Sequence, residues 1–362
     1  MFRSSTFRIV HTPISDGNPY QKELAEALRR SGHYVDLYTP VWPFPLIKYI
    51  RDNGKPDIFH MHWIHPFLVR KTILGSLIRS TLSLLEIALV RILGIKIVWT
   101  VHNVLNHERI QPETEKFFLR IIPEFFNKII FLSEASIDSF NDIVCPSKRV
   151  RDKYHIVPHG YYIGSYANRI SRSIARQVLD IDNDSFVLLC FGEVRPYKGL
   201  EIMIDLMEKT PDPNVRLIIA GRACNNSYEK AIKEAASFDK RILTFLGYIP
   251  DRFVQVFMNA SDIVVLPYRD ILNSGAAVLA MSFGKPIIAP DLGSMKELVD
   301  KNGGILFDPA DKKTLADALA KLKNADLQAM GKHNFKKIRH HDWDRISGMT
   351  SEIYNKVMGV CS

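Results

Sequence analysis

The sequence predicts an α/β fold with two doubly wound parallel sheets, and three observations lead to this prediction. The chain has 362 residues, 46% hydrophobic and 24% charged, so it can form two domains with separate cores. Short apolar runs alternate with helical patterns in both halves, which is typical of parallel sheets built from βαβ units. A stretch at 158–172, containing Pro, Gly, Ser and Tyr but little periodicity, separates the halves.

Six apolar runs in the first half predict strands. A helix is predicted at 19–30, because Pro19 is favourable in a first helical turn, and Gly94 suits the end of a later helix. The predicted strands are 7–11, 34–38, 57–62, 95–101, 128–132 and 155–157.

The second half repeats this architecture with six further apolar runs. We therefore predict an N-terminal Rossmann-like domain at 1–165 and a C-terminal domain at 166–342. The predicted strands are 186–190, 215–220, 242–245, 263–266, 286–289 and 305–307.

The first strand of the second half runs directly into the stretch FGEVRPYKG, which presents two permanent cations, Arg195 and Lys198. Ligands of doubly wound sheets bind at the carboxyl ends of such strands, so both residues suit an anion such as a diphosphate. The alternative is that they are ordinary surface charges.

A second anion-binding corner is predicted where the run 263–266 ends and a helix follows. Asn273 and Ser274 are candidate N-caps of that helix. The backbone N–H groups of Ser274, Gly275 and Ala276 would then point at an anion, with the helix dipole adding to the attraction.

The stretches FGEVRPYKG, LPYRDILNSGAAVLAMSFGKPIIAP and GSMKELVDKNGGILFDPAD resemble the carboxyl-terminal domain of GT-B glycosyltransferases of family four. The likeness covers 186–354 well and the first half more loosely. It implies two Rossmann-like domains facing a cleft, with an acceptor-side first domain onto which a terminal helix at 343–362 packs back.

The resemblance also implies an activity. Such an enzyme moves a hexose from a UDP- or GDP-linked sugar to a saccharide or lipid-linked acceptor, usually with retention, in surface polysaccharide or glycolipid assembly. Retention needs no protein nucleophile, and no cofactor or metal is expected because Arg195 and Lys198 supply the positive charge.

The family motif assigns roles to individual residues, with two departures. Arg195, Lys198 and His102 are the predicted catalytic residues, although many members carry the arginine where this chain has Glu193. Many members also carry two glutamates where this chain has Ile271 and Leu279. Possible substitutes for this pair are Asp270, Asn273 and Glu297.

Other residues are expected to contact the donor or the acceptor. Base recognition is predicted at the turn containing Tyr248, and Arg222 would face phosphate or ribose. The predicted donor-binding residues are Gly17, Gly192, Arg222, Tyr248, Asn273, Ser274, Gly275, Ala276 and Glu297.

The histidines of the first half suggest both a sugar site and a metal site. His62 and Trp63 are expected on the acceptor side, with Trp63 able to stack on a sugar. His60 and His62 share one face of a strand, as two metal ligands would, but no Cys or acid completes the set nearby. For His102 the alternative is a hydrogen-bonded structural histidine.

Charge and cysteine usage limit the partners and the compartment. The net charge is +9, and residues 1–160 carry 21 Lys and Arg against 15 Asp and Glu. The segment 67–94 is mainly apolar with four basic residues, so it is either a buried helix or a surface that lies on anionic lipid. It has no uncharged run of eighteen residues, which argues against a membrane span. No nucleic-acid platform is apparent.

The four cysteines are scattered and form no CxxC pair, and no secretory leader is recognised, so we expect free thiols in a cytoplasmic protein, either in solution or at the inner face of the plasma membrane. Two other functions stay open. They are a nucleotide-sugar epimerase on the same scaffold and a non-catalytic partner of a glycosyltransferase.

Overall fold

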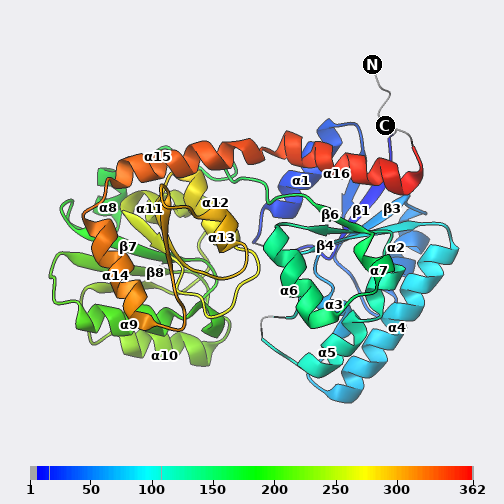
Figure 1. Cartoon of the computed structure of the whole chain (residues 1–362), viewed down its shortest axis with the longest axis horizontal. Helices are drawn as coiled ribbons and strands as arrows, with labels where there is room; N and C mark the ends of the chain where they lie inside the picture. Colours follow the sequence, from blue (N-terminus) through cyan, green and yellow to red (C-terminus); the bar gives the residue numbers. More distant parts are fainter. Residues whose placement is uncertain (1–5, 16, 107, 361–362) are drawn as a thin grey trace. The chain divides into compact units, whose positions relative to one another are not determined.

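The computed structural model describes residues 6–360 apart from 16 and 107. The chain divides into two compact units, the first formed by residues 1–160 with 341–362 and the second by residues 161–340 (Figure 1). The second unit therefore begins before the predicted residue 166, because Tyr162 is buried and its N–H donates to the Ser282 hydroxyl of that unit at 2.9 Å. Cys145, Cys190 and Cys224 are free thiols, as predicted.

The first unit contains one six-stranded parallel sheet in the order β2-β1-β3-β4-β5-β6. All six predicted strands are present within about a residue of their predicted ends. The elements are β1 (Arg8–Thr12), α1 (Tyr20–Arg30), β2 (Tyr34–Leu37), α2 (Pro45–Asn53), β3 (Ile58–Met61), α3 (His65–Leu68), α4 (Ile73–Ile92), β4 (Lys96–Val101), α5 (Pro112–Leu119), β5 (Lys128–Phe131), α6 (Glu134–Val144), α7 (Lys148–Arg151), β6 (Tyr154–Ile156) and α16 (Trp343–Met358).

The terminal helix α16 lies beside α1 in this unit (Figure 1). Arg30 donates to the Asp344 carboxylate at 2.7 Å, and His33 bonds the Ser351 hydroxyl at 3.1 Å. Trp343 and Tyr354 of α16 are both buried. Residues 343–358 thus help to complete the core of the first unit.

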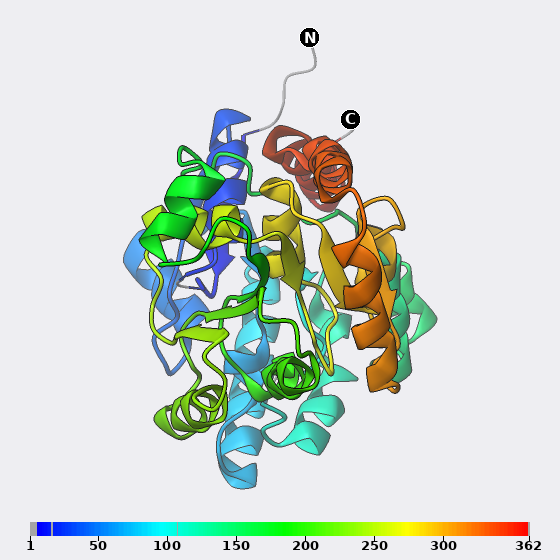
Figure 2. The ribbon, with the colours of Figure 1, turned by 90° about the vertical axis from the view of Figure 1, so that its left-hand side faces the viewer.

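The second unit contains a six-stranded parallel sheet in the order β12-β11-β10-β7-β8-β9. Figure 2 shows this unit towards the viewer. The elements are α8 (Arg172–Val178), β7 (Phe186–Phe191), α9 (Leu200–Lys209), β8 (Val215–Ala220), α10 (Asn226–Ala236), β9 (Ile242–Phe245), α11 (Asp251–Ala260), β10 (Ile263–Val265), α12 (Gly275–Ser282), β11 (Ile287–Pro290), α13 (Met295–Leu298), β12 (Gly304–Phe307), α14 (Lys312–Lys323) and α15 (Leu327–Ile338).

Helices cover both faces of this second sheet. Buried side chains of α9, α10 and α14, among them Met203, Ile232 and Leu319, form one core cluster with the strands. On the other face α11 packs on α8 and β7, and α12 packs on α15 (Figure 1). Burial on both faces explains why the strands are continuous apolar runs and not alternating patterns.

Each sheet has a point where the strand order reverses. In the first sheet β2 and β3 lie on opposite sides of β1, and in the second sheet β8 and β10 lie on opposite sides of β7. In doubly wound sheets, ligands bind at such a reversal, outside the carboxyl ends of the strands. The candidate residues fall at both points.

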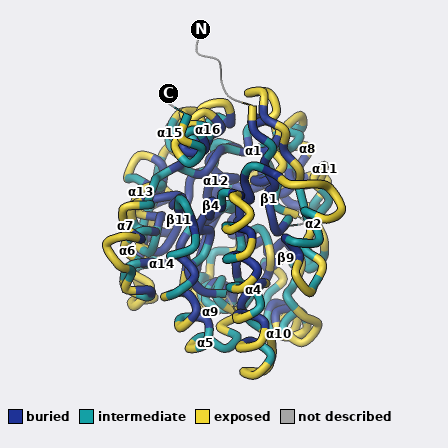
Figure 3. The backbone as a smooth tube through the Cα atoms, turned by 90° about the vertical axis from the view of Figure 1, so that its right-hand side faces the viewer, coloured by how far each residue is buried: buried dark blue, intermediate teal, exposed yellow. Residues whose placement is uncertain are grey.

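Helix α4 buries mainly polar side chains, together with Ile87 and Val90, and exposes an apolar stripe. Buried Ser80 and Ser83 donate to the carbonyls of Leu68 and Phe67 at 2.7 and 2.6 Å, and the buried Glu86 carboxylate accepts from the N-terminus of α2. Figure 3 shows exposed and buried positions alternating along this helix. The exposed apolar residues are Ile73, Leu74, Leu77, Ile78, Leu85, Leu89 and Ile92.

Among the described residues, α4 is also the one helix whose length and composition suit a membrane span. Its buried polar side is bonded into the first unit, so the helix is part of that unit's fold.

Candidate active site

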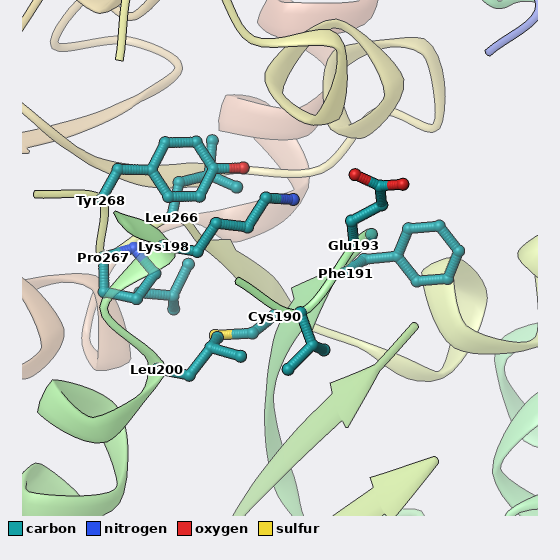
Figure 4. A pocket seen from close by; sticks show the side chains of 11 residues that line it. Cys190, Phe191, Glu193, Lys198, Leu200, Leu266, Pro267 and Tyr268 are labelled. Carbon is teal, nitrogen blue, oxygen red and sulfur yellow. The ribbon is translucent and has the colours of Figure 1, made fainter. Parts of the chain in front are cut away.

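A pocket of the second unit lies at its strand reversal, between the ends of β7 and β10. Its lining includes Gly192, Glu193 and Lys198 from the turn after β7, together with Pro267 and Tyr268 after β10. Figure 4 shows the Lys198 side chain extending between the Tyr268 ring and the Glu193 carboxylate. The pocket thus lies at the strand end where the sequence predicts an anion site, and the binding of a diphosphate there stays a prediction.

Backbone geometry in the turn after β7 directs Lys198 into the pocket. Gly192 has φ +108°, and a Cβ there would lie 3.0 Å from the Lys198 ammonium. A short 3-10 turn at Pro196–Lys198 follows, in which the Lys198 N–H donates to the Arg195 carbonyl at 3.0 Å. Glycine at 192 thus provides both the left-handed backbone and the room for the ammonium group.

The ammonium of Lys198 is held in a desolvated position. Burial lowers its pKa to about 8, and the nearby Glu193 carboxylate partly opposes this shift. The group lies 5.5 Å from the centre of the Tyr268 ring, whose face attracts cations. Lys198 is half-buried, so its ammonium offers a partly desolvated positive charge that suits an anion such as a diphosphate.

Arg195 is already paired with a carboxylate. Its Nε donates to Glu193 at 2.8 Å, and Arg222 lies 3.9 Å from the other Glu193 oxygen. Burial alone would raise the pKa of Glu193, but the hydrogen bond from Arg195 and the surrounding cations lower it overall. A bound diphosphate would therefore have to share these cations with the Glu193 carboxylate.

We expect the substitution Glu193→Gln to tighten binding of a nucleoside diphosphate about fivefold (~1 kcal/mol), because one negative charge next to the phosphates is removed. Isothermal titration at low and high salt checks this, and the gain should shrink as salt rises. Glu208→Gln, an exposed change on α9, is the control. Weaker binding by Glu193→Gln would show that Glu193 contacts the ligand favourably.

The N-terminus of α12 forms the second predicted anion corner. Ser274 is the N-cap and accepts from the Ala277 N–H at 3.1 Å, as predicted, and its hydroxyl also bonds Tyr268. Gly275 and Ala276 open the helix, and Asn273 precedes the cap, all half-buried. The first N–H groups of a helix have no intrahelical acceptor, so this end can bind an anion.

The positions of the absent glutamates are occupied by core residues. Ile271 and Leu279 are only 8% and 5% exposed. Apolar packing therefore stands where many family members have two carboxylates. That other groups recognise the sugar and ribose stays a prediction. Among these, Asp270 and Glu297 are exposed.

The remaining predicted donor residues lie on surface turns. Tyr248 is 65% exposed after β9, and the Arg222 side chain is 67% exposed after β8. A Cβ on Gly221 would overlap the Gly192 carbonyl, so the turns after β7 and β8 touch through backbone. Gly17, in the first unit, has φ +91° and open space where a Cβ would be.

In the first unit the predicted His102 and Trp63 lie together. His102 follows β4 and is buried, and the Trp63 ring stacks on it with centroids 4.3 Å apart. His62 is also buried, with its ring nitrogens hydrogen-bonded to His102 and His11 at 3.1 Å each. Because His62 is buried, the structure does not favour direct contact between His62 and an acceptor. Contact between an acceptor and the half-buried Trp63 stays a prediction.

Sequence reasoning missed His11, which lies opposite His60 in the β1–β3 pairing. Nitrogens of His11, His60 and His62 lie within 4.8 Å of one another, as in a metal site. The ring of His60, however, already bonds the Tyr354 and Thr100 hydroxyls at 2.6 and 2.7 Å. The three residues therefore fit a metal poorly, since His60 would have to give up one of these bonds.

The comparisons with known proteins identify relatives of both the sequence and the fold. The family described as Glycosyl transferases group 1 matches residues 171–337. GDP-mannose:glycolipid 4-beta-D-mannosyltransferase of Xanthomonas campestris pv. campestris is 26% identical over 353 residues, 96% of this chain and 90% of that protein. D-inositol 3-phosphate glycosyltransferase of Corynebacterium efficiens is 26% identical over 72% of this chain and 66% of that protein.

Solved structures share the fold over nearly the whole chain. Sucrose-phosphate synthase from Thermosynechococcus elongatus has a TM-score of 0.75 at 18% identity, covering 98% of this chain and 96% of that one. Anabaena Alr3699/HepE, solved with UDP and glucose, also has a TM-score of 0.75 at 18% identity, covering 96% and 99%. Residues 171–337 thus match the glycosyl transferases group 1 family, and the whole chain has the two-domain Rossmann-like fold of these solved structures, which together identify an enzyme that transfers a sugar.

Proposed function

We propose that this enzyme transfers a mannosyl group from GDP-mannose to a glycolipid acceptor at the surface of an anionic membrane. The observation that carries the proposal is the desolvated Lys198 ammonium in the pocket at the end of β7, next to Arg195. A leaving nucleoside diphosphate gains negative charge as the glycosidic bond breaks, and fixed cations stabilise that charge. The donor and the acceptor are those named for the Xanthomonas relative, which aligns with 96% of the chain.

Two assays test this function. A thermal-shift panel of GDP, UDP, ADP and dTDP should show the largest rise in melting temperature with GDP, because a ligand that binds only the folded state stabilises it. GDP-mannose with extracted glycolipid should then give labelled lipid. Consumption of donor without any acceptor would indicate an epimerase, and nucleotide binding without release of sugar would indicate a non-catalytic partner.

The stereochemistry of transfer is a separate question. The family resemblance implies retention, whereas the name of the Xanthomonas relative specifies a β-D-mannosyl product. The sugar of GDP-mannose is α-linked, so a β product from this chain requires inversion, in which a protein group takes the acceptor proton. The anomeric configuration of the product, read by NMR, decides between the two.

The exposed face of α4 supports the membrane part of the proposal. Its apolar side chains form one stripe along the helix, and the one acidic residue of α4, Glu86, points into the protein. Exposed Arg70 and Lys71 precede the helix. An apolar face flanked by basic residues is the pattern of helices that lie in an anionic lipid interface.

We expect the substitution Leu85→Glu to lower partition onto vesicles containing phosphatidylglycerol by about tenfold or more, because a buried leucine contributes ~2 kcal/mol and the new charge is repelled. Flotation measures this. Leu85 is 61% exposed, so folding should be unaffected.

The matched control is Phe238→Glu, which replaces an 85% exposed aromatic residue in the second unit. It should float like the wild type. If the wild-type protein does not float at all, or if both variants lose binding equally, α4 is not the membrane contact.

A further inference from the structure

Six buried side chains of the first unit form one continuous hydrogen-bonded chain that ends at His102. His102 Nε2 bonds His62 Nδ1 at 3.1 Å, and His62 Nε2 bonds His11 Nδ1 at 3.1 Å. His11 Nε2 then bonds the Tyr354 hydroxyl at 3.4 Å. That hydroxyl bonds His60 Nδ1 at 2.6 Å, and His60 Nε2 bonds the Thr100 hydroxyl at 2.7 Å. None of these residues is more than 7% exposed.

This hydrogen-bonded chain connects the strand reversal of the first sheet to helix α16. His11 lies on β1 and His60 on β3, directly opposite each other, while Thr100 lies on β4. Tyr354 comes from α16, 294 residues after His60. Helix α16 thus contributes a polar group to the buried histidine cluster at the strand reversal of the first sheet.

All members of the chain are neutral. Burial lowers the pKa of His11 and His102 to about 3 and holds the pKa of His60 and His62 well below the usual value. Burial likewise raises the pKa of the Tyr354 hydroxyl. A neutral imidazole has one N–H donor and one acceptor nitrogen, so the direction of one bond determines the direction of the next.

The Tyr354 hydroxyl sets that direction. A phenol O–H is a much stronger acid than a neutral imidazole N–H, so the short 2.6 Å bond is Tyr354 donating to His60 Nδ1. Tyr354 then accepts from His11 Nε2–H. The remaining bonds follow: His62 donates from Nε2 to His11, and His102 donates from Nε2 to His62.

We propose that Tyr354 on the terminal helix sets the tautomer of His102, holding its proton on Nε2 and making Nδ1 the acceptor nitrogen of the ring. Tyr354 is a positioning residue, and the role of His102 in transfer rests on the proposed function. The tautomer itself does not depend on that function. The same arrangement keeps all four histidines as Nε2–H tautomers.

Two-bond ¹H–¹⁵N correlation NMR of the full chain, with ¹⁵N-labelled histidine, reads the tautomers directly. The wild type should show His102 as the Nε2–H form. His102 as the Nδ1–H form would overturn the proposal. A metal bound in equimolar amount to the purified protein, held by His11, His60 and His62, would overturn it too, since it breaks the chain.

Two substitutions at separate points of the hydrogen-bonded chain should move the His102 proton to Nδ1. In Tyr354→Phe, His11 Nε2–H loses its acceptor, and reversal of the bonds to His62 and His102 avoids a buried unpaired donor. In Thr100→Val, His60 Nε2–H loses its acceptor, and reversal through Tyr354 avoids the same cost. Thr100→Val keeps the proposal testable if Tyr354→Phe fails to fold.

The matched control is Tyr154→Phe, which removes a half-buried hydroxyl that bonds Asn141 at 3.2 Å elsewhere in the first unit. It should leave the tautomers and kcat unchanged. Tyr354→Phe should lower kcat about tenfold with the donor KM unchanged, because only the orientation of a proton has changed.

The two readouts separate the possible failures. If Tyr354→Phe and Thr100→Val both leave the His102 tautomer as in the wild type, the hydrogen-bonded chain does not set that tautomer, whatever the kinetics. If the tautomers shift as expected but the wild type transfers no sugar, the proposed function is wrong and the role of Tyr354 in setting the His102 tautomer is confirmed.

Discussion

The substitution Lys198→Ala is expected to lower kcat about 10²–10³-fold with little change in stability. The ammonium lies in a desolvated pocket at the end of β7, where a charge-assisted donor to a leaving diphosphate is worth far more than in water. Sugar transfer at saturating donor measures the effect. Lys209→Ala removes an exposed lysine of the neighbouring helix α9 and is the control.

The pH dependence of kcat/KM provides an independent check of the same group. Burial lowers the pKa of Lys198 to about 8, so kcat/KM of the free enzyme should fall as pH rises through that value. The residual activity of Lys198→Ala should lack this fall. Nearly normal transfer by Lys198→Ala would remove the physical basis of the donor site.

The fold of this chain could be predicted because each signal was local. Twelve apolar runs, separated by helical patterns and turn residues, correspond to the twelve strands found in the described part of the chain. The pocket at the end of β7 falls where the sequence predicts a site for the same reason, since Lys198 follows its strand within a few residues. Local sequence also predicted the Ser274 cap, which needs only a polar residue before a helix.

The orientation of α4 could not be predicted. The sequence shows a stripe of apolar residues at helical spacing, and such a stripe usually faces the core. Here much of the core side is polar: serines and Glu86, each bonded to a backbone group of α2 or of residues 66–70, lie beside the apolar Ile87 and Val90. Those acceptors are set by tertiary structure, so periodicity alone leaves the direction of the helix open.

The histidine chain was missed for a related reason. Strand alternation placed His60 and His62 on one face, but it assigned no partner to either. Their partners, His11 and Tyr354, come from a different strand and from the last helix. A contact over 294 residues has no sequence signature without an alignment.

Lowering the pH from 7.5 to 5.5 is expected to destabilise the first unit by several kcal/mol. Burial lowers the pKa of each of seven histidines of this unit, so the unfolded chain binds more protons than the folded one below about pH 6.5. Their stabilising effect is complete above that pH and is lost as pH falls towards the folded pKa values. Each histidine contributes about 1 kcal/mol at pH 5.5, against a typical total of about 5–15 kcal/mol.

Tryptophan fluorescence during urea unfolding measures this unit alone, because all four tryptophans, Trp42, Trp63, Trp99 and Trp343, belong to it. The midpoint should fall steeply between the two pH values. Among the described residues, the second unit has no buried histidine, since its His333 and His340 are half-buried and exposed. A second transition seen by circular dichroism should therefore move little.

A single substitution tests whether buried histidines cause the effect. His159→Asn removes one titrating group, while its amide can still donate to the Gly160 carbonyl as the His159 Nδ1 does. The variant should lose about 1 kcal/mol of the pH dependence and keep its stability at pH 7.5. A midpoint that is the same at both pH values in the wild type would mean that the buried imidazoles accept protons without unfolding, and the hydrogen-bonded chain would then have to tolerate a charge.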